Sequence, residues 1–162
     1  TICVKSPDPV MFLKYWNNRE ATKEKFLSDP NGDFWLDTGD KATMDDEGWI
    51  YFVGRADDVI NSAGYRIGPA EVENSLLSHP AIAMSAVIGV PDEARGELVK
   101  AFIILKENNK PSDELALEIQ NYVKSRLAAH EYPRSIEFVN ELPMTTTGKI
   151  QRRLLRKRHI VS

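Results

Sequence analysis

The chain has 162 residues with a hydrophobic share of 42% and a net charge of −3, which suits one or two small domains with a substantial core. Its single cysteine, Cys3, excludes an internal disulfide and a cysteine-rich zinc motif and favours a reducing compartment. No apolar run approaches the roughly eighteen residues that cross a membrane, and no signal-peptide pattern opens the chain, which starts with threonine.

The first part of the chain alternates turn signals with apolar runs. Residues 1–6 predict a strand, which Pro7 and Pro9 close. Residues 10–28 contain repeated apolar contacts and predict a helix. The sequence DPNG at 29–32 is a strong stop signal, so a new element is expected after it.

A small β subdomain is expected next. The run FWLDTGD at 34–40 begins a series of short strands, which the turn DDEG at 45–48 separates. Residues 49–54 are the clearest of these strands. Trp35 and Trp49 are expected to pack inside this subdomain, as large aromatic side chains usually do.

The composition shifts from β-rich to mixed α/β at residues 54–58, where we place a domain boundary. Pro69 suits the first position of a helix. The apolar residues Val72, Leu76 and Leu77 of this helix are expected on one buried face.

The rest of the chain alternates strands and helices. Residues 81–90 and 98–105 predict two buried strands. Ser112 is a good N-cap for a helix with acidic residues in its first turn and apolar residues at a 3.6-residue period. A short strand is expected at 135–139 and a basic helix at 149–158.

The last fourteen residues hold six lysines and arginines and no acidic residue. Such a tail could bind nucleic acid. However, Leu154 and Leu155 favour an amphipathic helix that packs on its own domain, because little basic surface is expected elsewhere. Nucleic acid is therefore not an expected partner.

The richest motif is GRADDVINSAGYRIGPAEVE at 54–73. In this motif, Gly64 and Gly68 bracket Arg66. Glycine permits positive φ and close approach of a ligand to the backbone, while arginine offers a planar fork to phosphate or hydroxyl oxygens. The motif therefore predicts a loop that lies against a phosphorylated ligand.

Two further motifs each allow an ordinary structural interpretation. In LDTGD, Asp40 could accept hydrogen bonds from two ribose hydroxyls, although aspartate and glycine are also common turn residues. In LPMTTTGKIQRR, Lys149 follows Gly148 in a flexible loop that could deliver an ammonium group to an active site, or it is simply an exposed loop lysine. The GxxxxGK(S/T) spacing of a phosphate-binding P-loop is missing, and Ile150 follows the lysine.

Together and in this order, the three motifs resemble the C-terminal signatures of the adenylate-forming superfamily, which includes acyl-CoA synthetases, nonribosomal peptide adenylation domains and luciferases. The resemblance covers essentially the whole chain. The segments MFLKYWNN, DDVINSAGYRIGPAEVE, AAHEYPR and GKIQRR are most similar to acetyl and medium-chain acyl-CoA synthetases. Leu36 and Asp37 depart from the Tyr-Arg that many members have before TGD, whereas Asn61 in place of a frequent lysine fits these two groups.

This resemblance implies two half-reactions. A carboxylate attacks the α-phosphate of ATP to give acyl-AMP and pyrophosphate, and the thiol of CoA then displaces AMP to give a thioester. Asp40 and Arg55 would hold the ribose hydroxyls, and Arg66 would approach the phosphates. Lys149 would be the catalytic lysine, which neutralises the charge that develops where carboxylate, ribose and α-phosphate meet. Magnesium would arrive with ATP, and no metal site in this chain is expected, because its histidines lack the spacing of metal ligands.

The resemblance also implies that a small C-terminal domain rotates about Asp57 between the half-reactions. Rotation would withdraw Lys149 and bring the Gly64 loop to the active site. The residues that match CoA contacts in medium-chain relatives are Ala63, Gly64 and Tyr65 along the path of the thiol, and Arg95, Lys124, Tyr132, Pro133 and Arg134 at the nucleotide.

The fold implied is α/β (α+β). Residues 1–54 would be the last β subdomain segment of a large N-terminal domain, 55–58 the hinge, and 59–162 a compact mobile domain with a central mixed sheet flanked by helices. The family's phosphate loop and acyl pocket do not occur in this sequence, so the chain alone is expected to be an inactive fragment that needs an N-terminal adenylation domain. A cytoplasmic location is expected, or the mitochondrial matrix in a eukaryote.

Two alternatives keep this fold. The chain could belong to an adenylation domain that loads a carrier protein, which would still use Asp40 and Lys149. It could also be a non-catalytic module that binds CoA or an adenine nucleotide. Binding of CoA and AMP by the chain alone would favour the module, whereas activity restored by an N-terminal fragment would favour the enzyme.

Overall fold

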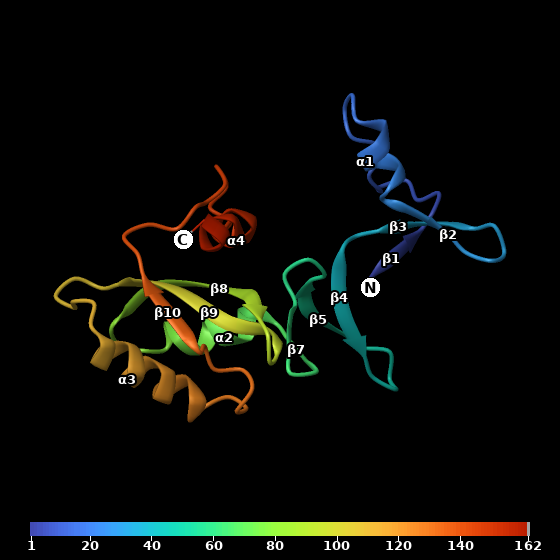
Figure 1. Ribbon diagram of the computed structural model, residues 1–162. Helices are drawn as coiled ribbons and strands as arrows, with labels where there is room; N and C mark the ends of the chain where they lie inside the picture. The colour runs from blue at the N-terminus through green and yellow to red at the C-terminus, as the bar shows by residue number, and fades with distance from the viewer. Residues whose placement is uncertain (162) are drawn as a thin grey trace. The chain divides into compact units, whose positions relative to one another are not determined.

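The computed structural model describes residues 1–161, and the chain forms two compact units (Figure 1). The first unit is Thr1–Asp57, and the second begins at Asp58. The division falls within the segment 55–58, where a charged Arg-Ala-Asp-Asp sequence leaves little apolar side chain to bury.

The first unit is built mainly from short antiparallel strands. A three-stranded sheet has β3 (Phe34–Asp37) at its centre, with β1 (Cys3–Lys5) and β2 (Phe26–Ser28) on either side. A separate two-stranded ribbon consists of β4 (Asp40–Met44) and β5 (Ile50–Arg55). The strands predicted at 1–6 and 49–54 are therefore present.

The turn predicted at 45–48 is confirmed. The carboxylate of Asp45 accepts hydrogen bonds from the backbone N–H groups of Glu47 and Trp49. Gly48 completes the turn at a φ of +87°, a conformation that glycine adopts without steric cost.

The helix predicted over 10–28 is wrong. Helix α1 covers only Arg19–Lys23, and it begins where the Asn18 side chain accepts a hydrogen bond from the Ala21 N–H group. Asn17 has a φ of +50°, so no right-handed helix can run through it. Residues 26–28 form β2 instead, because pairing with β3 satisfies their backbone groups.

The prediction that Trp49 packs inside the first unit is also wrong, because its side chain is 67% exposed. Trp35 is half-buried and donates a hydrogen bond from Nε1 to Asp29 Oδ2. Among the fully described residues 1–57, Leu36 is the one buried apolar side chain. The exposed apolar side chains of the β4–β5 ribbon are Met44, Trp49, Ile50, Tyr51 and Phe52.

The second unit contains a mixed sheet, as predicted, and this sheet has five strands (Figure 1). The long strands β8 (Ile82–Asp92) and β9 (Gly96–Leu105) form an antiparallel pair and match the two buried strands predicted. β10 (Ser135–Phe138) runs parallel to β9. The short hairpin of β6 (Ile60–Ser62) and β7 (Tyr65–Ile67) joins the sheet through β6.

Helices cover both faces of this sheet. Figure 1 shows α2 (Pro69–Leu77) and α3 (Asp113–Lys124) on one side and α4 (Arg152–Val161) on the other. Successive residues of β8 and β9 point to opposite faces, so two cores form. The first core contains Ile60, Ile67, Val72, Leu76, Ile82, Val87, Val99, Ala101, Ile103, Ile119 and Val123. The second contains Ala86, Ile88, Val90, Phe102, Leu142 and Leu155.

The starts of α2 and α3 agree with the sequence signals. Pro69 opens α2, and the Ser112 side chain accepts a hydrogen bond from the Leu115 N–H group at the start of α3. One detail is wrong: Leu77, expected on the buried face of α2, is 47% exposed. It follows the fully buried Leu76 by one residue, a rotation of about 100° around the helix, which turns it away from the core.

The packing of α4 leads to a prediction about stability. Leu155 is 1% exposed, so Leu155→Ala is expected to lower the free energy of unfolding by about 2–5 kcal/mol through lost burial and a residual cavity. Urea unfolding measures this change. The matched control is Leu154→Ala on the same helix, where the side chain is 39% exposed and a much smaller loss is expected. Equal losses for both variants would contradict the packing described.

Candidate functional site

In the first unit, Asp40 and Arg55 face each other across the β4–β5 ribbon. They are register partners at the open end of the ribbon, and Arg55 Nη1 donates to Asp40 Oδ1 at 3.2 Å. The same nitrogen donates to the backbone carbonyl of Thr38 at 2.9 Å. Arg55 Nε also donates to Asp57 Oδ1 at 3.3 Å. Arg55 therefore bonds to both Asp40, the predicted ribose ligand, and Asp57, the predicted hinge residue.

The Thr-Gly sequence before Asp40 explains why the pair forms. Gly39 has a φ of +77°, and a Cβ atom built on it would lie 2.8 Å from Arg55 Nη2. A larger residue would thus strain the backbone and displace the guanidinium group. Thr38 Oγ1 accepts a hydrogen bond from the Asp40 N–H group, which fixes the start of β4.

The charge on Arg55 is stabilised by its neighbours. Burial opposes the charged form, but the carboxylates of Asp57 and Asp40 outweigh this effect and raise the pKa of Arg55. The side chains of Arg55 and Asp40 remain 45% and 31% exposed, so both are open to a ligand.

In the second unit, Lys149 lies in a tight loop that α4 follows. Two hydrogen bonds join Thr145 and Lys149: the Thr145 N–H group donates to the Lys149 carbonyl at 2.8 Å, and the Lys149 N–H group donates to the side-chain Oγ1 of Thr145 at 3.0 Å. Gly148 turns the chain at a φ of +79°. The loop predicted to be flexible is therefore held by its own hydrogen bonds, while the Lys149 side chain stays exposed.

The β6–β7 hairpin contains the predicted Gly64 loop. Its two turn residues, Ala63 and Gly64, both have positive φ, at 51° and 84°, the combination found in a type I′ turn. The Ala63 N–H group donates to the carbonyl of Arg95 at 2.9 Å, so Arg95 lies beside this turn. Arg66 is exposed on β7, and the Arg95 side chain forms an ion pair with Asp92 at 3.3 Å.

The ring of Tyr65 continues this surface by stacking on His130. The two ring centroids are 3.8 Å apart and the rings are inclined by only 12°. The sequence interpretation did not select His130, although it lies in the AAHEYPR segment. The aromatic ring of His130 in the AAHEYPR segment was a signal that could have selected this residue. However, no local spacing in the sequence connects His130 with Tyr65.

The loop after His130 assembles three of the other predicted residues around one ring. The ammonium group of Lys124 lies 5.5 Å from the centre of the Tyr132 ring, and the Arg134 guanidinium lies 4.8 Å from it. Arg134 Nη1 also donates to Tyr132 Oη at 2.9 Å. Pro133 lies between these two residues in the sequence and is buried. The result is a partly buried aromatic ring flanked by two cations, suited to a base with phosphates.

The predicted residues thus fall into separate groups. Asp40, Arg55 and Asp57 belong to the first unit, and the remaining predicted site residues belong to the second. Within the second unit, the turn at 63–65 adjoins Arg95 and, through Tyr65, the loop at 128–134.

Comparison with known proteins gives this arrangement its context. Residues 71–149 match the family model described as the AMP-binding enzyme C-terminal domain. The mitochondrial acyl-coenzyme A synthetase ACSM1 of Mus musculus is 51% identical over 160 residues. This chain belongs to the adenylate-forming superfamily. The acetyl-coenzyme A synthetase of Bacillus subtilis is 50% identical over 155 residues.

A solved adenylate-forming relative has the same fold. The ATP-bound RpMatB-BxBclM chimera B1 superposes with a TM-score of 0.76 and is 37% identical, with 90% of this chain and 28% of the chimera covered. The alignments cover 97% of this chain for ACSM1 and 96% for the acetyl-coenzyme A synthetase. They cover 27% and 26% of those two relatives, so the chain spans about a quarter of their length.

No helix within residues 1–161 is long and apolar enough to cross a bilayer. Among residues 1–158, whose side chains the structure describes, no group of three or more histidine, cysteine or acidic side chains is arranged to hold a metal ion.

Proposed function

We propose that this chain is the C-terminal part of an AMP-forming acyl-CoA synthetase, which converts a carboxylate, ATP and CoA into acyl-CoA, AMP and pyrophosphate through an acyl-adenylate. Its superfamily membership supports this function, as does its sequence identity of 51% and 50% with two named coenzyme A synthetases. The observation that supports it most directly in the structure is the Asp40–Arg55 pair at the open end of the β4–β5 ribbon.

In this proposal, Asp40 and Arg55 hold the ribose of ATP. A carboxylate oxygen accepts hydrogen bonds from hydroxyl groups, and the guanidinium adds donors from one side. The existing bond between them orients Asp40 before the nucleotide arrives. Asp57 then serves as the hinge, and its carboxylate remains 70% exposed while it accepts a single bond from Arg55.

The basic residues of the second unit take different parts in the two half-reactions. Lys149 supplies positive charge where the carboxylate meets the α-phosphate, and Arg66 approaches the phosphates. Neither side chain forms an ion pair with another described residue, so both charges are available for a ligand. Magnesium comes with ATP in this scheme.

CoA is proposed to bind along the surface that runs from Ala63, Gly64 and Tyr65 to the Tyr132 ring. Pantetheine passes the Gly64 turn, the Tyr132 ring packs on the adenine, and Arg95, Lys124 and Arg134 attract the phosphates. An adenylation domain that loads a carrier protein is not favoured, because both curated relatives are named for coenzyme A.

A partner in the form of an N-terminal adenylation domain is also proposed. The apolar side chains of the β4–β5 ribbon have too little of their own unit to cover them, and such an exposed apolar surface usually marks an interface. The cytoplasm, or the mitochondrial matrix in a eukaryote, is the proposed location, and the mitochondrial relative is consistent with the second.

The nucleotide site can be tested with Asp40→Ala in the full-length protein that contains this chain. We expect a loss of about tenfold to a hundredfold in kcat/KM for ATP, because a hydrogen bond to a charged group is removed. Carboxylate-dependent pyrophosphate release measures this loss. Asp46→Ala, an exposed aspartate in the neighbouring turn, is the control and should behave like the wild type.

The proposed function itself is tested by adding CoA to the same assay. Acyl-CoA, AMP and pyrophosphate should form in equal amounts, whereas the 162-residue chain alone should release no pyrophosphate. Turnover by the chain alone would overturn the proposed need for an N-terminal domain. Absence of turnover in the full-length protein with every carboxylate tried would overturn the synthetase assignment.

A further inference from the structure

Four charged side chains of the second unit form a cluster at the start of α4. Arg152 and Arg156 lie four residues apart, so they share one face of the helix. Arg152 Nη2 donates to both carboxylate oxygens of Glu73 at 2.8 Å, and its Nη1 donates to Asp58 Oδ2 at 3.2 Å. Arg156 Nη2 donates to Asp58 Oδ1 at 2.8 Å. Two cations and two anions therefore balance within one network.

The network is largely buried and geometrically specific. The side chains of Arg152, Glu73 and Asp58 are only 19%, 12% and 14% exposed. Glu73 Oε1 also accepts the Val87 N–H group at 2.8 Å, which fixes this carboxylate to β8. Burial opposes the charge on Arg152, but Glu73 and then Asp58 outweigh it and raise the pKa of Arg152. A buried fork of this kind holds its partners in one relative orientation.

The network lies next to the Lys149 loop in the chain. Arg152 is three residues beyond Lys149, and the intervening Ile150 packs on the second core and pairs with Met144. The Gln151 N–H group donates to the Pro143 carbonyl at 2.8 Å. Hydrogen bonds therefore fix the loop at both ends, and the ion pairs of Arg152 fix the segment that leads into α4.

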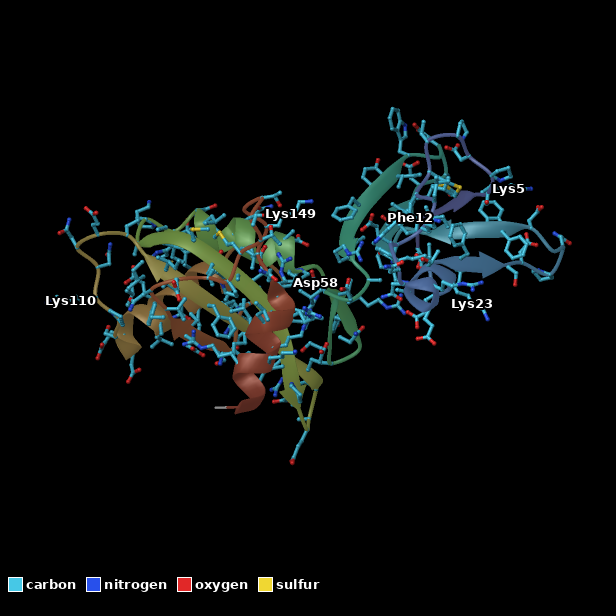
Figure 2. The ribbon with its side chains drawn as sticks, turned by 90° about the horizontal axis from the view of Figure 1, so that it is seen from above. Lys5, Phe12, Lys23, Asp58, Lys110 and Lys149 are labelled. Carbon is cyan, nitrogen blue, oxygen red and sulfur yellow. The ribbon has the colours of Figure 1, made fainter. Side chains whose placement is uncertain are left out.

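At its other end, the network holds Asp58, the residue at which the second unit begins. Figure 2 labels Asp58 and Lys149, and the hydrogen bonds of Arg152 and Arg156 to Asp58 join the start of this unit to α4. Arg152 and Arg156 lie 94 and 98 residues after Asp58 in the sequence. Their ion pairs with Asp58 therefore connect the beginning of the second unit to its last helix. Asp58 directly follows Asp57, the proposed hinge residue.

We propose that Arg152 and Arg156 are positioning residues for Lys149, which act with Asp58 and Glu73 to couple the catalytic lysine rigidly to the hinge. This inference rests on the proposed function. Because Lys149 serves adenylation and is withdrawn for thioester formation, loss of the network should impair the first half-reaction selectively. A network that served stability alone would affect both half-reactions together.

The experiment measures both half-reactions in the full-length protein. Arg152→Ala is expected to lower kcat for pyrophosphate release by about a hundredfold, the effect of a catalytic group displaced by about 1 Å. Transfer of the acyl group from preformed acyl-AMP to CoA should be unchanged. Arg152→Lys keeps the charge but not the fork, so a smaller loss is expected. Glu73→Gln should reproduce the selective loss, and combining it with Arg152→Ala should add little, since both remove one interaction.

Arg158→Ala provides the matched control on the same helix. Arg158 pairs with Glu137 at 2.9 Å and its side chain is 54% exposed, so both half-reactions should stay normal. Hydrogen exchange of the amides in 145–156 gives a readout that does not depend on activity, and exchange should rise in Arg152→Ala but not in Arg158→Ala. If Arg152→Ala does not fold, Arg152→Lys and Glu73→Gln decide the question.

The outcomes separate this inference from the proposed function. An active wild type with an unimpaired Arg152→Ala variant, or equal losses in both half-reactions, would overturn the positioning role and leave the synthetase assignment intact. An inactive wild type would overturn both. A selective loss of pyrophosphate release, with raised exchange around Lys149, is the result expected.

Discussion

Lys149→Ala is expected to lower the rate of pyrophosphate release by about a hundredfold or more, while transfer from preformed acyl-AMP to CoA stays near the wild-type rate. The ammonium group is the charge proposed to meet the α-phosphate during adenylation. Its loop is fixed by the Thr145–Lys149 hydrogen bonds and by the Gly148 turn, so the position of Lys149 is set before a ligand binds. Removing a preorganised charge raises the barrier of that half-reaction alone.

The two half-reactions are measured separately in the full-length protein, one as carboxylate-dependent pyrophosphate release and the other as CoA-dependent consumption of acyl-AMP. Lys157→Ala is the matched control, because it removes an exposed lysine from α4 without touching the loop. Stability should be nearly unaffected in both variants, since both side chains are exposed. Normal pyrophosphate release by Lys149→Ala would remove this residue from the catalytic scheme.

The elements that could be predicted from the sequence have strong and consistent local signals. The strands around 81–105 are continuous apolar runs, and α3 combines the Ser112 cap with a regular apolar period. Where the local signals conflicted, the prediction over 10–28 was wrong. Asn18 was a usable cap signal there, but pairing of 26–28 with β3 is a tertiary contact that no local pattern reveals.

The candidate site shows the same limit. Asp40 and Arg55 could be selected from their motifs, but their cross-strand contact depends on the bulged register of β4–β5, which includes a shift between Lys41 and Ala42. The basic tail is a clearer case. Its excess of arginine is visible in the sequence, whereas the carboxylates that pair with Arg152 lie 79 and 94 residues away. Two basic residues of this tail, Arg152 and Arg156, therefore belong to an internal network.

The surroundings of Gly39 and Gly64 show that a glycine is needed at these two positions for different reasons. Gly39 is required by its own surroundings, because a side chain would meet Arg55. Gly64 has open space around the position of a Cβ atom, with nothing within 4 Å. Its positive φ alone explains glycine at a type I′ turn, so a ligand path is a separate claim that needs its own test.

That test is Gly64→Leu, which is expected to reduce thioester formation by about a hundredfold or more while pyrophosphate release continues. The leucine side chain would project into the path proposed for pantetheine. A Cβ atom at this position meets no atom within 4 Å, so the main expected cost to folding is the left-handed backbone, about 1–2 kcal/mol. The expected product of the variant is therefore acyl-AMP that CoA cannot discharge.

Gly32→Leu separates backbone strain from obstruction. Gly32 has a φ of +85°, almost the same as the +84° of Gly64, and its surroundings are equally open. Both variants should lose similar stability, as measured by thermal unfolding, but only Gly64→Leu should lose the second half-reaction. A parallel loss in Gly32→Leu would attribute the effect to strain. Normal thioester formation by a folded Gly64→Leu protein would mean that the thiol reaches the acyl-adenylate by a route that does not pass this turn.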